Sequence, residues 1–121
     1  RERLATFAAS NAIFFASDTS FRDSDHARRA LDELAGLMRG NREMIRVVGY
    51  TDESGRADRN DPLAQQRAEA VVAELISRGV PRERLVAVGR ANRLSLSPET
   101  GATSPNRRVE FELGFIGETA R

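Results

Sequence analysis

The chain has 121 residues, of which 40% are hydrophobic and 31% are charged, and these values are typical of one globular domain. Its 19 basic and 18 acidic residues leave a net charge of +1. Such a balance provides no long-range field to attract nucleic acid or an anionic membrane surface. The sequence contains no cysteine, which excludes disulfides and thiolate metal sites. We therefore expect a small domain with neither a nucleic-acid partner nor membrane contact of its own.

The N-terminal part contains one predicted strand. Residues 1–10 mix charged and small side chains, so a lead-in helix and a linker or tail both stay open. The segment NAIFFA, residues 11–16, is short, aromatic and β-branched, which predicts a buried strand. Its apolar run is too short to cross a bilayer. Because the sequence begins with Arg1 and not with Met, we expect it to be an excised or processed piece, and any signal peptide, lipid anchor or membrane segment would lie outside it.

A first helix is predicted after a polar loop. Asp23, Ser24 and Asp25 are all suitable N-cap residues, and apolar side chains then recur at helical spacing. Gly40 is a suitable residue to end this helix. His26, the only histidine, is expected on the surface of the first turn, where no partners for a catalytic triad are visible.

A second strand and helix follow. The segment MIRVVGY, residues 44–50, predicts a strand, and residues 51–60 are rich in turn formers. Asp61 can cap a helix that has Pro62 at its first position, which is a favoured arrangement. An apolar stripe continues along this helix, and Arg67 lies at its border.

The remaining chain contains two more predicted strands. Gly79 ends the second helix, and RLVAVG, residues 84–89, predicts a third strand. A long polar loop occupies residues 90–105. In the fourth strand, residues 107–115, apolar and charged residues alternate, so one face is expected to be wet. The order β-α-β-α-β-β predicts an α+β fold with two main helices packed on one face of a four-stranded mixed sheet.

An acid and a base stand at the junction of the second strand and helix. Asp52 follows the strand, and Arg67 lies on the helix that folds back onto it. One interpretation is a salt bridge that fixes the loop to the helix. The other is a clamp for a zwitterion, in which Asp52 accepts from an ammonium and Arg67 forks onto a carboxylate. The spacing alone leaves both interpretations open, and a ligand could replace a salt bridge present without it.

Metal, cofactor and catalytic sites are not indicated. The spacing of Asp52, Asp58 and Asp61 does not match a calcium-binding loop, and the glycines form no phosphate-binding pattern. We therefore predict neither a metal, nor a cofactor, nor an enzyme. Arg107 and Arg108 begin the last strand, and alternation directs them to opposite faces, so one of them can reach the pocket. The alternative is that they belong to a solvated edge strand.

Four motifs carry a family resemblance: GYTDESG at residues 49–55, N-x-x-L-A-x-x-R-A at 60–68, RGVPRERLVAVG at 78–89, and NRRVE at 106–110. Together they resemble the OmpA-like peptidoglycan-binding domain found in OmpA-type porins, Pal lipoproteins and MotB-type stators.

The resemblance covers residues 12–113. It implies a domain over residues 11–115, between a lead-in at 1–10 and a tail at 116–121. It also implies non-covalent binding to the diaminopimelate of the peptidoglycan stem peptide, anchoring a larger envelope protein to the cell wall. The implied location is the periplasm, with attachment to the outer, or less favoured the inner, membrane through an upstream segment. The parent architecture stays open, as does a homodimer.

The resemblance also implies which residues form the site. In that family the Asp of the TD pair and the Arg of the R-A pair hold the diaminopimelate headgroup, and these correspond to Asp52 and Arg67. Further positions of the family site correspond to Thr51, Asn60, Leu63, Ser17 and Asp18. Arg107 and Arg108 of the last strand correspond to the arginine pair that borders it.

Three positions depart from the family pattern: Tyr50 where many members have His, Ala64 where Ser is usual, and Arg90 where an acid is frequent. The changed segment that begins at Arg90 motivates an alternative function. In this alternative the domain is a structural or protein-interaction module that kept the fold and lost peptidoglycan binding.

Overall fold

The computed structural model describes residues 2–17, 19–40, 42–51, 57–91 and 107–113. The elements in chain order are α1 (Glu2–Ser10), β1 (Ala12–Ser17), β2 (Ser20–Phe21), α2 (Ser24–Arg39), β3 (Ile45–Tyr50), α3 (Ala57–Ser77), the 3-10 helix η1 (Arg82–Arg84), β4 (Leu85–Ala91) and β5 (Arg108–Leu113).

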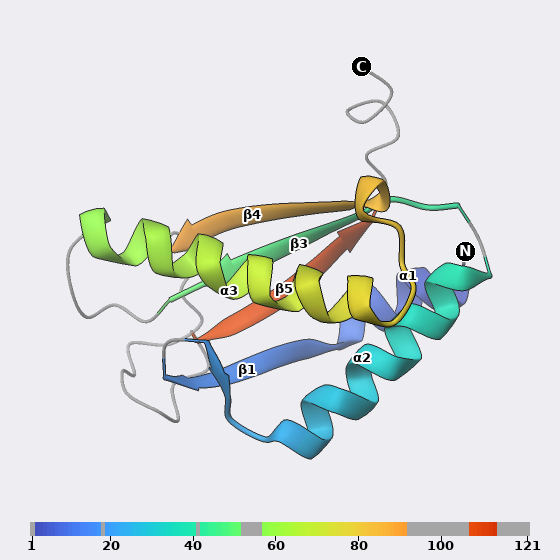
Figure 1. Cartoon of the computed structure of the whole chain (residues 1–121), viewed down its shortest axis with the longest axis horizontal. Helices are drawn as coiled ribbons and strands as arrows, with labels where there is room; N and C mark the ends of the chain where they lie inside the picture. The colour runs from blue at the N-terminus through green and yellow to red at the C-terminus, as the bar shows by residue number, and fades with distance from the viewer. Residues whose placement is uncertain (1, 18, 41, 52–56, 92–106, 114–121) are drawn as a thin grey trace.

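The strands form one mixed sheet in the order β2-β1-β5-β3-β4 (Figure 1). β3 and β4 are parallel, whereas β5 pairs antiparallel with both β1 and β3. The predicted α+β class and mixed sheet are confirmed. The fifth strand is β2, which pairs with the end of β1 over only two residues and is too short to show a sequence period.

α2 and α3 cross one face of the sheet, as predicted (Figure 1). Their apolar stripes and the inward side chains of β1, β3 and β5 form a single core. Residues 2–10, for which the sequence allowed a helix or a tail, form α1. Leu4 and Phe7 of this helix are buried, and the Phe7 ring lies 6.1 Å from that of Phe111 on β5. α1 is therefore part of the packed domain.

The ends of α2 follow the sequence signals. Asp23 is the N-cap, and its carboxylate accepts a hydrogen bond from the His26 N–H at 3.0 Å. This bond lowers the pKa of the Asp23 carboxyl below its usual value, because it favours the charged form. The helix ends at Gly40, as expected, and His26 is exposed, as expected.

The predicted start of the second main helix is wrong. α3 begins at Ala57, so Asp61 is not its N-cap and Pro62 lies inside the helix. The sequence rule places proline at the first helical position, where its missing N–H has no partner to lose. One turn further in, proline costs one ladder hydrogen bond and crowds the carbonyl four residues before it. The predicted end is confirmed: the helix stops at Ser77, and Gly79 has a left-handed φ of 94°.

Two glycines let α3 lie directly against the sheet. Gly49 on β3 and Gly89 on β4 are register partners. A Cβ at Gly49 would lie 2.0 Å from the Ala64 carbonyl oxygen, and one at Gly89 would lie 2.7 Å from the Gln65 nitrogen. No side chain fits in that space, so the pair brings the N-terminal half of α3 onto the ends of β3 and β4.

Candidate functional site

The predicted site lies where the ends of several strands meet. β5 runs antiparallel to both β1 and β3, so the last residues of β1 and β3 and the first residue of β5 lie at the same end of the sheet. Ser17 ends β1, Thr51 follows β3, and Arg108 begins β5. The glycine contacts place α3 over this end. The topology therefore gathers the four segments to which the sequence assigned the site.

Arg67 extends from α3 into this region and is almost fully buried, at 2% exposure. Its Nη1 donates a hydrogen bond to the Tyr50 carbonyl oxygen at 3.2 Å. The centre of its guanidinium lies 5.4 Å from the centroid of the Phe15 ring. A charge removed from water is costly unless it is paired, and the carbonyl dipole and the ring face offset part of that cost. Arg67 is thus held rigidly and can fork onto a carboxylate.

Thr51 lies one residue beyond the carbonyl that holds Arg67. It is 1% exposed, and its hydroxyl oxygen has no hydrogen-bond partner among the described residues. A buried polar group left without a partner costs about 1–3 kcal/mol. Such a hydroxyl is suited to a hydrogen bond with a polar ligand group.

The other predicted site residues are only partly described. Asn60 and Leu63 both lie in α3, and the Leu63 side chain is partly buried. The Arg107 guanidinium donates to the carbonyl oxygen of Ala16 near the end of β1, so this side chain links β1 to the start of β5. Asp52 and Asp18 lie outside the described residues. The choice between a salt bridge and a clamp for Asp52 and Arg67 therefore stays open.

The solvated edge strand proposed as an alternative for Arg107 and Arg108 is wrong. β5 lies between β1 and β3, because the last strand in sequence is inserted into the middle of the sheet. Arg108 is 2% exposed, its Nε donates to Glu110 Oε2 at 2.6 Å, and its guanidinium lies 3.8 Å from the Tyr50 ring centroid. Arg108 thus stacks on the residue whose carbonyl holds Arg67.

Sequence reasoning did not include Phe15 and Tyr50 among the site residues. Strand alternation offered a signal for Phe15, because it places that ring on the same face of β1 as the core residue Ile13. Tyr50 carried no such signal. Its role depends on Arg67 of α3, Arg108 of β5 and Arg90 of β4, which donates to its hydroxyl at 3.2 Å, and their convergence is a property of the tertiary fold.

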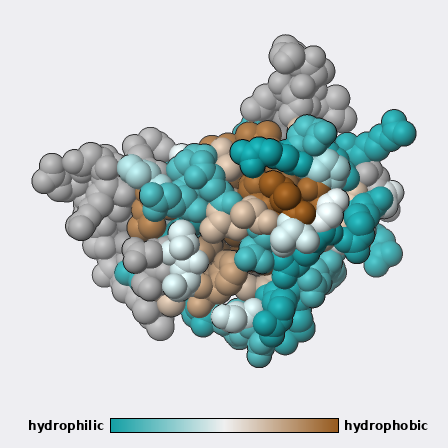
Figure 2. Space-filling view, in the orientation of Figure 1, coloured by the Kyte–Doolittle hydropathy of each residue, from teal (hydrophilic) through white to brown (hydrophobic). Residues whose placement is uncertain are grey.

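Other features of the described chain do not point to a different site. Within these residues no three His, Asp or Glu side chains are grouped closely enough to hold a metal ion. No described helix has the length and apolarity needed to span a membrane. A groove of about 1070 Å³ runs between α3 and β4, and Figure 2 shows its apolar floor among polar side chains. Val72, Ile76 and Leu85 line this groove, and the site residues described above are not among its lining residues.

Fold and site together define a small α+β domain with a buried arginine at the strand ends. The chain belongs to the OmpA family, whose model matches residues 14–108. The family comprises structural, cell-wall-binding domains that are not enzymes, so the predicted absence of enzymatic activity agrees with membership.

Three relatives illustrate the similarity. The peptidoglycan-associated lipoprotein of Pseudomonas aeruginosa is 31% identical over 110 residues, which cover 89% of this chain and 65% of that protein. The crystal structure of the peptidoglycan-associated lipoprotein from Burkholderia pseudomallei superposes with a TM-score of 0.75 at 26% identity, covering 88% of this chain and 92% of that one. The cell wall anchor of the T6SS from Pseudomonas aeruginosa gives a TM-score of 0.62 at 28% identity, covering 81% and 72%.

The chain spans less than two thirds of the curated relatives it matches first, for example 32% of the probable lipoprotein YiaD of Escherichia coli.

Proposed function

We propose that this domain binds peptidoglycan non-covalently through the diaminopimelate of the stem peptide. The observation that carries the proposal is the buried Arg67 guanidinium, which donates to the carbonyl of Tyr50 at the end of β3, and the buried hydroxyl of the next residue, Thr51, which lacks a described partner. Both groups are suited to a polar, anionic ligand, and two of the relatives are named as peptidoglycan-associated lipoproteins.

Diaminopimelate carries two charges that an acid and a base could recognise together. The free end of its side chain carries an ammonium and a carboxylate on one carbon. In our proposal Arg67 forks onto the carboxylate, and Asp52, the residue after Thr51, accepts from the ammonium. A lysine at the same peptide position has the ammonium and lacks the carboxylate. The arrangement therefore predicts discrimination between the two stem-peptide types.

The remaining residues are proposed to surround this headgroup. Thr51 contributes its hydroxyl, and Leu63 provides an apolar wall from α3. Asn60 and the segment at Ser17 and Asp18 complete the rim. Arg107 and Arg108 support it from the start of β5.

We further propose that the domain acts in the periplasm and anchors a larger envelope protein to the cell wall. The names of the relatives, which include lipoproteins, outer membrane proteins and a cell wall anchor, motivate this proposal. The parent would be attached to the outer or, less favoured, the inner membrane. A homodimer is compatible with such a role, and the molar mass in solution would test it.

The test is calorimetric titration with two soluble tripeptides, L-Ala-D-Glu-diaminopimelate and L-Ala-D-Glu-L-Lys. We expect saturable binding of the first peptide and affinity at least about tenfold weaker for the second, because a charge-assisted hydrogen bond is lost. Asp52→Ala and Arg67→Ala should each abolish measurable binding of the first peptide. Arg29→Ala, which changes an exposed arginine on α2, is the matched control and should bind like the parent.

The alternative function makes the opposite prediction. A structural or protein-interaction domain would give no saturable signal with either peptide at millimolar concentration while remaining fully folded. Equal affinity for both peptides would exclude the carboxylate fork at Arg67.

A further inference from the structure

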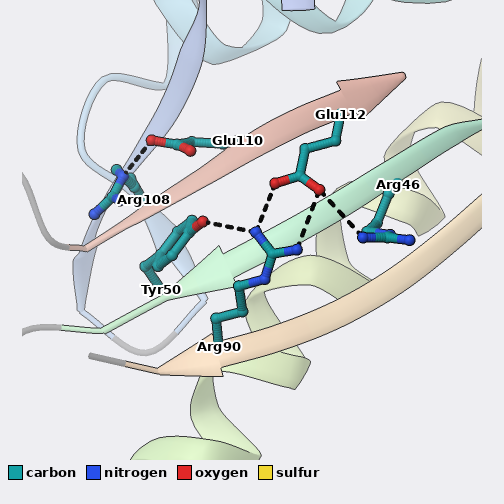
Figure 3. A network of polar contacts seen from close by, with 6 residues as sticks. All are labelled: Arg46, Tyr50, Arg90, Arg108, Glu110 and Glu112. Carbon is teal, nitrogen blue, oxygen red and sulfur yellow. Dashed lines mark hydrogen bonds and ion pairs between the residues drawn. The ribbon is translucent and has the colours of Figure 1, made fainter. Parts of the chain in front are cut away.

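The helix-free face of the sheet carries an extended network of charged side chains. Gly49 faces α3, so alternation along β3 turns Arg46 and Tyr50 to the opposite face. Arg46 Nη1 lies 3.3 Å from Glu112 Oε1, and Arg90 grips the same carboxylate with both terminal nitrogens at 2.5 and 3.2 Å (Figure 3). Arg90 Nη1 also donates to the Tyr50 hydroxyl at 3.2 Å.

Arg90 follows Gly89, which faces α3, so it points to this network, and the register of β4 is irregular at this position. The register partner of Gly49 is Gly89, and the partner of Tyr50 is Ala91, so Arg90 is an extra residue opposite β3. A bulge of this kind bends the strand. The Arg90 side chain extends from the edge strand across β3 and reaches both Tyr50 and Glu112 of β5 (Figure 3).

Tyr50 is the residue at which this network meets the candidate site. Its carbonyl oxygen accepts from Arg67 of α3, its ring is stacked under Arg108 of β5, and its hydroxyl accepts from Arg90 of β4. Tyr50 is only 1% exposed, so solvent replaces none of these contacts readily. These contacts therefore fix both the side chain and the backbone of Tyr50, the last residue of β3. Thr51 of the candidate site follows directly.

We propose that Arg90 is a positioning residue for the peptidoglycan site, acting through the Tyr50 hydroxyl on the carbonyl that holds Arg67. This inference rests on the proposed function, and Arg90 itself does not contact the ligand. The bulge and the bidentate pair with Glu112 preorganise Arg90, and a site held rigidly in its bound geometry loses less entropy on binding. The hydrogen bonds to Glu112 and then to Tyr50 raise the pKa of the Arg90 guanidinium above its ordinary value.

Affinity for the diaminopimelate tripeptide tests the proposal in a double-mutant cycle. Tyr50→Phe removes the hydroxyl and keeps the ring under Arg108, whereas Arg90→Ala removes its donor. We expect each variant to bind about fivefold more weakly, as for one lost hydrogen bond, and the double variant to bind no more weakly than either single one. Arg46→Ala is the matched control. This variant removes an arginine that pairs with Glu112, as Arg90 does. Figure 3 shows no hydrogen bond between Arg46 and Tyr50. Arg46→Ala should bind like the parent.

A second measurement does not require any ligand. The NMR signal of the Arg67 Nε–H in the free protein reports how firmly its guanidinium is held. We expect this signal to shift or broaden in Arg90→Ala and Tyr50→Phe and to stay unchanged in Arg46→Ala. An unchanged Arg67 signal in both variants would overturn the proposal.

The outcomes separate this inference from the proposed function. If Arg67→Ala loses the tripeptide while Arg90→Ala binds it like the parent, the site is right and the role of Arg90 is wrong. If the parent does not bind the tripeptide, the proposed function fails, and the Arg67 signal alone decides whether Arg90 positions that side chain. If Arg46→Ala weakens binding as much as Arg90→Ala, the network acts only through general stability and the proposal is wrong.

Discussion

The two faces of the sheet are built on different physical principles. The face under α2 and α3 is an apolar core in which a pair of glycines allows backbone contact. The opposite face is held by arginines, carboxylates and one tyrosine whose charges stay paired close to solvent. Both faces reach the candidate site through the same residue, since the Tyr50 carbonyl holds Arg67 and its ring supports Arg108. Packing thus brings the site together, and the charged face orients it.

The largest effect is expected on the helix-covered face. Gly49→Ala places a methyl group 2.0 Å from the Ala64 carbonyl oxygen, so α3 must move away from β3. We expect the free energy of unfolding to fall by more than about 3 kcal/mol, at or beyond the usual cost of overpacking. Gly89→Ala, where the nearest atom is 2.7 Å away, should cost less. Urea unfolding of both variants measures the difference. Equal, small losses would show that α3 does not lie against the glycine pair.

An intermediate effect is expected on the helix-free face. Arg108→Ala removes the stack on Tyr50 and the ion pair with Glu110 from a buried position. We expect a loss of about 2–3 kcal/mol in unfolding free energy. Arg28→Ala is the matched comparison, because its ion pair with Asp25 is exposed and should contribute about 0.5 kcal/mol or less. A loss for Arg108→Ala as small as that for Arg28→Ala would mean that burial does not strengthen this face.

The smallest effect is expected at the exposed start of α2 and depends on pH. The pKa of Asp23 is lowered by its bond to the His26 N–H. Its negative charge therefore stabilises the fold at pH values above 3.8, the ordinary pKa of an aspartate. That contribution is lost as the pH falls through the lower, folded-state pKa. Asp23→Asn should therefore melt slightly below the parent at pH 7, and the gap should close in acid. A gap that is constant from pH 7 to pH 2 would contradict this assignment.

Much of the helix-covered face was predictable from the sequence, because local chemistry determines it. The N-cap within Asp23–Asp25, the end of the helix at Gly40 and the buried strands all follow from residue type and spacing, and the structure selects Asp23 among the three candidate caps. The start of α3 was not predicted, since the sequence rule places Pro62 at the first helical position and the helix instead begins at Ala57 and continues through this proline.

The charged face was less predictable. Arg90 stands out in the sequence only as a departure from a family pattern, and its role depends on a bulge and on the insertion of β5 beside β3. The burial of Arg108 follows from the same insertion. Periodicity shows which residues alternate along a strand, and it does not show which strands become neighbours. The family motifs pointed to Arg67 as a candidate, whereas the contacts that hold it required the structure.

Arg67 is proposed to hold the diaminopimelate carboxylate, and co-sedimentation of Arg67→Lys and the parent with purified diaminopimelate-type sacculi tests this. Lysine keeps the charge and loses the planar fork. We predict that the parent sediments with the sacculi, and that Arg67→Lys, folded by circular dichroism, stays mostly in the supernatant. Sedimentation of Arg67→Lys equal to that of the parent would contradict the fork.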